Sequence, residues 1–161
     1  MATPPTQAKP LSADAKMIGT WVLVSYELRD GENGIAYPLG KDAQGQIIYD
    51  NVGNMSCHLI NPHPPARPDD ASDGVAYEAR MSYERYSSYF GRYVIDEVNR
   101  EIRHHVIGAL MPGWAGTTVV RSYAFDGQDT LTLSAMTGSG GQQAVLKWRR
   151  ARRENGSSAG Q

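Results

Sequence analysis

Two histidines stand side by side in the segment EIRHHVIGALMPGW (101–114), which otherwise has the alternation of a β-strand. Neighbouring residues of a strand point to opposite faces of a sheet, so only one of the two can face a protein interior. His104 shares its face with Ile102 and Val106, which predicts that His104 faces inward and His105 faces water. An inward imidazole can act as a general acid or base, or it can be a core histidine that one hydroxyl or carbonyl satisfies. The residues leave both roles open.

A positive charge is also predicted on an inward face. In the segment 117–125, Arg121 falls on the same face as Val119, Tyr123 and Phe125. A guanidinium among large apolar side chains is costly to bury alone, because it loses its hydration without replacement. We therefore expect Arg121 to have an acidic or phenolic partner, or to bind the anion of a ligand.

The same alternation collects further polar side chains on inner faces. Glu27 follows Trp21 at two-residue intervals and is expected near an open mouth, or buried with a partner. A mostly apolar cavity with a few convergent polar groups is typical of a small-molecule site. Tyrosines also fill small barrels and hydrogen-bond to one another, and packing stays the alternative for each of them. The predicted ligand-binding residues are Glu27, Tyr49, Tyr89, Tyr93, His104, Trp114, Arg121 and Tyr123.

The pattern leaves the orientation of two further positions open. Trp114 lies between glycines in the loop MPGWAG (111–116), where it can form a rim or lid over a cavity, or pack beneath the loop. In the segment 55–60, Cys57 belongs to the more apolar face, which makes His58 external unless a bulge intervenes.

Two classes of function fit these residues. The first is a binding protein that takes a small hydrophobic metabolite, aromatic or carbonyl-bearing, into its interior. The second is a cofactor-independent enzyme, an isomerase, cyclase or lyase/dehydratase, in which His104 moves a proton while Arg121 and Tyr93 stabilise a developing enolate or phenolate. Hydrolysis is not supported, because Cys57 has no evident activating base and Ser25 and Ser134 lie on predicted strands with no elbow-type turn. A structural or partner-binding module would need an exposed apolar patch, which the pattern does not identify.

The elements that must position these residues are short alternating runs separated by turn-forming residues, the pattern of an all-β protein. Eight antiparallel strands joined by short turns can close into an up-and-down β-barrel whose interior holds one small ligand. A two-sheet sandwich is the alternative, but it needs longer connections. The eight predicted strands are 19–29, 45–50, 55–60, 89–96, 101–110, 117–125, 130–135 and 143–150.

One segment, 74–89, interrupts the strands. It contains helix-forming residues, with Val75, Ala79 and Tyr83 at four-residue intervals. This spacing predicts a short amphipathic helix between the third and fourth strands, lying against the sheet or across an open end of the barrel.

Bulk properties narrow the class of protein. The 161 residues carry 16 Lys and Arg against 17 Asp and Glu, a net charge of −1 that gives no basic footprint for nucleic acid. We expect one barrel domain (16–150) between disordered tails (1–15 and 151–161). The single Cys57 and the histidine spacing predict no disulfide and no metal site, and we expect no cofactor. No membrane segment or signal peptide is evident, so we expect a cytoplasmic protein; a homodimer stays open.

Several segments together resemble the bacterial and fungal lipocalin-like domain family, whose members have calycin-type barrels. They are GTWVLVSYE (19–27), GQIIYDNVGNMSCHLINP (45–62), YFGRYVID (89–96) and HHVIGALMPGWAGTTVVRSYAFDGQDTLTLS (104–134). The resemblance implies a barrel with a pocket and supplies no reaction.

The opening Gly19-Thr20-Trp21 also resembles the Gly-x-Trp signature of the wider lipocalin group. In that group the Trp closes one end of the barrel beneath an Arg of the last strand, and Arg150 is the matching residue. The disulfides and signal peptide of secreted lipocalins have no counterpart here, so a secreted carrier role is not implied.

Overall fold

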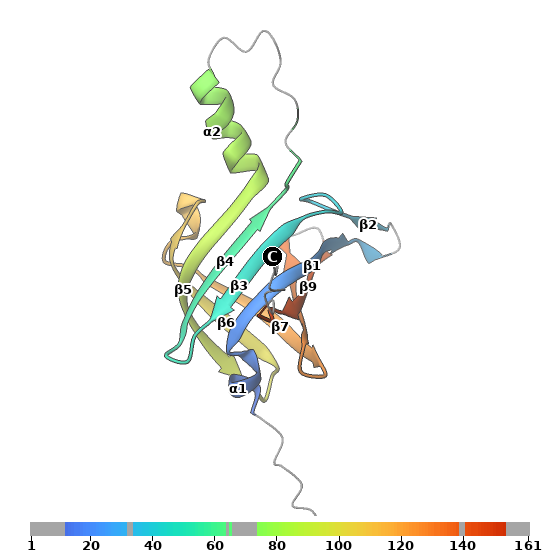
Figure 1. Ribbon diagram of the computed structural model, residues 1–161, viewed down its shortest axis with the longest axis vertical. Helices are drawn as coiled ribbons and strands as arrows, with labels where there is room; N and C mark the ends of the chain where they lie inside the picture. Colours follow the sequence, from blue (N-terminus) through green and yellow to red (C-terminus); the bar gives the residue numbers. More distant parts are fainter. Residues whose placement is uncertain (1–11, 32–33, 64, 66–73, 139–140, 154–161) are drawn as a thin grey trace, which may run out of the picture.

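The computed structural model describes residues 12–31, 34–63, 65, 74–138 and 141–153, which form an all-β structure with few helices (Figure 1). Most strands lie within two residues of their predicted bounds; β5 begins three residues earlier, and the two-residue β2 has no predicted counterpart. The strands are β1 (Gly19–Arg29), β2 (Ile35–Ala36), β3 (Gln44–Tyr49), β4 (Asn54–Ile60), β5 (Tyr86–Asp96), β6 (Glu101–Ala109), β7 (Thr118–Asp126), β8 (Thr130–Thr137) and β9 (Gln142–Arg150).

The sheet closes into a barrel through β1. From β3 to β9 each strand pairs antiparallel with the next strand along the chain. The first four residues of β1 pair with β3, and β1 pairs along most of its length with β9, which closes the ring. Short β2 pairs only with the end of β1. The prediction of an eight-stranded antiparallel barrel is thus confirmed, with β2 as one extra strand.

The helix α2 (Gly74–Arg85) lies between β4 and β5, but it does not cover the barrel as expected. None of its residues is buried, and Val75, on the face predicted to pack, is 79% exposed. Arg85 ends α2 and Tyr86 begins β5 without an intervening loop, so the direction of the strand carries the helix away from the barrel (Figure 1). Three apolar residues on one helix face do not hold α2 against the sheet.

The opposite end of the barrel is closed by α1 (Ala13–Met17), a short helix that the sequence did not predict. Residues 13–15 of α1 fall within the predicted N-terminal tail, and residues 1–11 lie outside the described part of the chain. The hydroxyl of Ser12 accepts a hydrogen bond from the backbone N–H of Ala15, which caps the helix. The indole N–H of Trp21 donates to the carbonyl of Met17 at 2.9 Å and ties α1 to β1.

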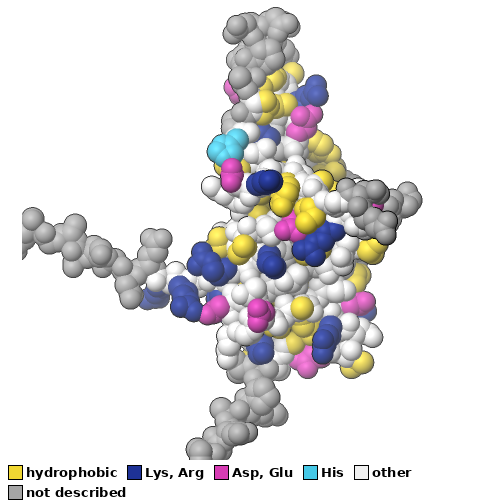
Figure 2. Space-filling model, turned by 90° about the vertical axis from the view of Figure 1, so that its right-hand side faces the viewer, with side chains coloured by type: hydrophobic (Ala, Val, Ile, Leu, Met, Phe, Trp, Pro, Cys, Tyr) yellow, Lys and Arg dark blue, Asp and Glu magenta, His cyan; other side chains and the backbone are white. Residues whose placement is uncertain are grey.

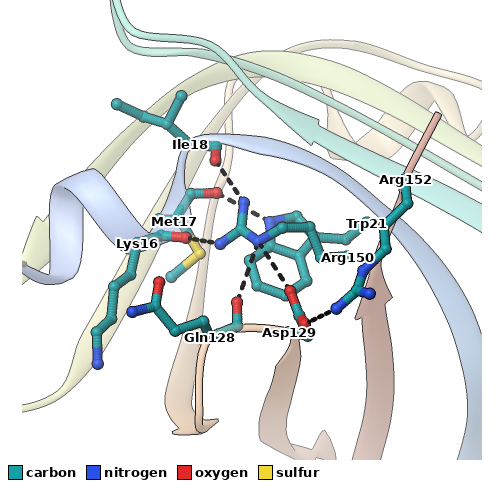
Figure 3. A network of polar contacts seen from close by, with 8 residues as sticks. All are labelled: Lys16, Met17, Ile18, Trp21, Gln128, Asp129, Arg150 and Arg152. Carbon is teal, nitrogen blue, oxygen red and sulfur yellow. Dashed lines mark hydrogen bonds and ion pairs between the residues drawn. The ribbon is translucent and has the colours of Figure 1, made fainter.

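Arg150 covers the ring of Trp21, as the resemblance implies (Figure 3). Its guanidinium carbon lies 4.2 Å from the centre of a Trp21 ring, a cation–π arrangement. The guanidinium donates to backbone carbonyls of Lys16 and Ile18 at the start of the barrel and of Gln128 in the β7–β8 turn. Trp21 and Arg150 therefore have structural roles, because they join the first strand, the last strand and a turn at the closed end.

The interior above this end is one continuous core. Its fully buried members include Trp21, Ile47, Ile102, Leu131 and Trp148. On the outside, Figure 2 shows basic and acidic side chains interspersed over one face, with hydrophobic side chains scattered between them. None of the helices in the described ranges has the length and apolar character needed to cross a bilayer.

Candidate functional site

The barrel contains a cavity of about 670 Å³ at the end away from α1. Its walls come from most of the strands, and its rim includes the end of α2 and the short 3₁₀ helix η2 (Pro112–Trp114). The size and mainly apolar lining are those of a pocket for a small molecule. Residues that line it include Tyr26, Leu39, Ile47, Cys57, Leu59, Tyr89, Trp114, Arg121, Leu133, Leu146 and Trp148.

Arg121 points from β7 into this cavity, as predicted. The residue is half-buried, because its guanidinium faces the open space of the cavity. It forms no ion pair with any carboxylate of the described residues. It interacts electrostatically with Tyr89 and Cys57; burial raises the pKa of Tyr89, and the guanidinium of Arg121 lowers it in part. The predicted partner of Arg121 is therefore phenolic rather than acidic.

His104 faces inward, as predicted, with 0% exposure. The hydroxyl of Tyr49 lies 2.9 Å from its Nε2, and the hydroxyl of Tyr89 lies 2.9 Å from its Nδ1. Burial, together with the positive charge of Arg121 and the neighbouring His105, lowers the pKa of His104 to about 3. The ring is neutral at ordinary pH, so one tyrosine accepts its N–H and the other donates to its free nitrogen.

This arrangement places His104 behind the cavity wall, not on it. Both of its nitrogens are occupied, and Tyr89 lies on the cavity while His104 is absent from the lining. His105 is exposed on the outer face, where Nδ1 lies 2.9 Å from the hydroxyl of Thr118. The structure thus agrees with the core role that the sequence left open for His104.

Cys57 lies on the cavity wall between Met55 and Leu59, on the more apolar face of the strand as the sequence predicts. Burial raises the pKa of its thiol to about 12, so the group is neutral and a poor nucleophile. His58 lies on the outer face of the same strand, as expected. Its Nδ1 is 3.0 Å from the hydroxyl of Tyr86 in a separate shallow groove.

Glu27 was predicted on the inner face, and this prediction is wrong. The pairing of β1 with β9 shifts between Leu23 and Ser25, so a β-bulge at Val24 reverses the alternation of the rest of the strand. Tyr26 consequently lines the cavity, while Glu27 points outward and forms an ion pair with Arg29 at 2.8 Å. Leu23 and Tyr26 face the same side although they are three positions apart, whereas residues on one face of a regular strand are an even number apart. This odd spacing is the signal that sequence reasoning missed.

Three predicted tyrosines face inward but do not line the cavity. Tyr49 is buried against His104. The Tyr93 hydroxyl donates to the carbonyl of Asp50 at 2.7 Å, and its ring meets Tyr49 edge-on. Tyr123 packs against Phe125 toward the closed end. The structure does not bring Tyr93 together with Arg121 at the cavity.

Trp114 lies at the rim of the cavity. Its half-buried ring meets the ring of Tyr89 at a centroid distance of 5.6 Å, edge to face. Trp114 therefore belongs to the rim of the cavity, which is the first of the two alternatives given above, a rim or lid as opposed to packing beneath the loop. It can contact an occupant of the cavity and pack on Tyr89 at the same time.

Trp148 is a cavity residue that sequence reasoning did not include. It is fully buried, and its indole N–H is the one buried side-chain nitrogen or oxygen among the described residues that has no hydrogen-bond partner. An orphaned buried donor is uncommon and calls for an explanation. The sequence could have indicated this, because Trp148 stands two residues after Leu146 on β9 and so shares its inward face.

Within the ranges that the structure describes, no group of three or more His, Cys, Asp or Glu side chains is placed to hold a metal ion. The polar groups on the described part of the cavity lining are the guanidinium of Arg121, the carboxylate of Glu84 at the rim, and hydroxyl groups such as those of Tyr89, Ser87 and Thr118.

Three comparisons with known proteins were made: with curated proteins, with solved structures and with family models. A comparison with curated proteins finds no match. Among solved structures, a redesigned β-barrel matches with 13% sequence identity and a TM-score of 0.44, over 87% of this chain and 96% of that one. The family model described as the lipocalin-like domain matches residues 18–151, from the residue before β1 to the residue after β9. The chain therefore belongs to the lipocalin-like domain family.

Proposed function

We propose that the protein binds a small hydrophobic molecule, aromatic or carbonyl-bearing, in the cavity of the barrel. The cavity of about 670 Å³ carries the proposal, because it is large enough for one small molecule and has mainly apolar walls. The interior of an eight-stranded barrel is wide enough to hold a single small ligand in this way.

The aromatic side chains of the wall favour a flat ligand. Tyr26, Tyr89, Trp114 and Trp148 come from four different elements and surround the space with ring surfaces. Aromatic pairs stabilise by about 0.5–1.5 kcal/mol beyond the burial of their area. Arg121 is the donor that would fix the orientation of a carbonyl oxygen.

The enzyme alternative has less support from the same residues. Its acid–base group, His104, lies behind Tyr89 with both ring nitrogens occupied and a pKa of about 3. A general base needs a pKa near the working pH and must reach the proton that it removes. The cavity supports binding better than proton transfer.

Titration with the neutral fluorescent probe N-phenyl-1-naphthylamine tests the proposal. The variant Ala135→Phe fills the cavity, since Ala135 lies on its wall, and should abolish saturable binding. Ala124→Phe is the matched control, because Ala124 is exposed on the outer face of β7. Equal binding by wild type and Ala135→Phe, or no binding by wild type, would contradict the proposal.

A further inference from the structure

We infer that the ligand carries an anionic oxygen group, such as a carboxylate, that binds Arg121 at the floor of the cavity while the apolar body of the ligand lies between Arg121 and the rim. The inference rests on the proposed binding function and adds the chemical class of the ligand.

The first argument is the charge of the cavity floor, by which we mean the lining residues Cys57, Tyr89 and Arg121. Cys57 and Tyr89 are neutral, because burial raises the pKa of both groups above any ordinary pH. His104 is neutral too, with its pKa lowered to about 3. Arg121 keeps its proton under all such conditions. The floor therefore holds one full positive charge.

No described carboxylate balances this charge. The one acidic side chain on the cavity lining is Glu84, which belongs to α2 at the rim and is paired with Arg80 at 2.7 Å. Glu27, which the sequence placed on the inner face, points outward instead. A charge enclosed by protein without a counter-charge is unfavourable, and an anionic ligand removes that penalty.

The geometry of the donors is the second argument. A guanidinium presents N–H groups in a planar fork that matches the two oxygens of a carboxylate. Trp148 and Tyr89 belong to the same cavity wall, although the Trp148 N–H itself is buried and the Tyr89 hydroxyl also bonds to His104. The guanidinium donates hydrogen bonds to oxygen acceptors and repels a cationic ligand.

Two probes with the same aromatic skeleton separate charge from shape. The first, 1-anilinonaphthalene-8-sulfonate, carries one anionic group, and the second, N-phenyl-1-naphthylamine, carries none. Wild type should bind the sulfonate about 10- to 100-fold more tightly, the range expected for charge-assisted hydrogen bonds. Arg121→Met should reduce the affinity for the sulfonate by about the same factor, so that the ratio of the two affinities falls toward one.

Arg149→Met is the matched control, because it removes a positive charge from the exposed face of β9. It should bind both probes like wild type. Arg121→Lys, which keeps the charge without the fork, should have intermediate affinity for the sulfonate, and it keeps the test informative if Arg121→Met does not fold.

The outcomes distinguish the two claims. Two results would contradict an anionic group on the ligand and leave the binding function intact. One is equal affinity of wild type for the two probes. The other is an affinity for the sulfonate that neither Arg121→Met nor Arg121→Lys changes. Failure of both probes to bind wild type would overturn the binding function and this inference with it.

Discussion

The hydroxyl of Tyr89 lies 2.9 Å from Nδ1 of His104, while Tyr89 itself lines the cavity. One side chain thus forms the wall of the binding space and satisfies a buried imidazole behind it. Tyr49 satisfies the other nitrogen of the same ring. These hydrogen bonds fix the position of Tyr89, which lines the same cavity as Arg121.

Removing the hydroxyl of Tyr89 tests that arrangement. Tyr89→Phe leaves a ring nitrogen of His104 buried without a partner, so we expect the free energy of unfolding to fall by about 1–3 kcal/mol. Urea denaturation measures the change. Tyr86→Phe is the control, since Tyr86 bonds to the outer His58, and it should change stability by less than about 1 kcal/mol. Equal effects of the two substitutions would contradict a structural role for the buried chain.

The buried histidine predicts a pH dependence of stability. The pKa of His104 falls from 6.5 to about 3 on folding, first through burial and then through the charges of Arg121 and His105. Between these values the unfolded chain binds a proton that the folded protein does not, so stability decreases as the pH falls through this window. The slope from one such group is at most about 1.4 kcal/mol per pH unit.

His104→Gln removes the titrating group and should flatten this part of the profile. The free energy of unfolding of each protein is measured in urea at about pH 4.5 and at neutral pH. The change in this free energy between the two pH values is then compared between wild type and His104→Gln. Asp50 and Asp96 also lose stabilising ionisation at low pH, because backbone hydrogen bonds lower their pKa values. Both proteins share these groups, so their contribution cancels in the comparison. Identical pH profiles would show that His104 titrates normally in the folded protein.

The closed end predicts a strict requirement for glycine at position 19. Gly19 has φ +133°, and a Cβ there would lie 2.9 Å from Nη1 of Arg150, the guanidinium that covers Trp21. Gly19→Ala should therefore destabilise the protein by about 1–3 kcal/mol in thermal or chemical unfolding. Gly113→Ala has no atom within 4 Å of the added carbon and an ordinary φ, and its effect should be small. A harmless Gly19→Ala would mean that Arg150 is not held over the ring.

The unbalanced charge of Arg121 has a consequence for the ligand-free protein. Arg121→Met replaces an enclosed charge with an apolar side chain of similar length, so we expect stability to stay the same or to rise by about 1–2 kcal/mol. For a chain of this size, each kcal/mol corresponds to a rise in Tm of about 2–4 °C. Calorimetry of the ligand-free protein measures it. A loss of more than about 2 kcal/mol would instead identify Arg121 as a structural element of the barrel.

Much of the fold follows from period-two alternation. The alternation gave the bounds of β1 as Gly19–Arg29, the inward faces of His104 and Arg121, and the outward face of His58. These residues lie on strands whose two faces differ clearly in polarity, so the direction of each side chain can be read from its neighbours.

The errors have local physical causes. The bulge at Val24 inserts one residue into the β1–β9 pairing, which alternation alone cannot represent, and so Tyr26 and Glu27 exchange faces. The direction of α2 is set by its direct continuation into β5, not by the apolar spacing within the helix. Hydrogen-bond partners across the barrel, such as Tyr49 with His104, depend on strand register and on side-chain length.

A crystal structure of the protein with 1-anilinonaphthalene-8-sulfonate bound tests the central claim most directly. The account predicts the aromatic rings in the cavity between Trp114 and Trp148, and the sulfonate within hydrogen-bond distance of the Arg121 guanidinium. A cavity filled by side chains, or a probe bound only in the outer groove beside His58, would contradict it.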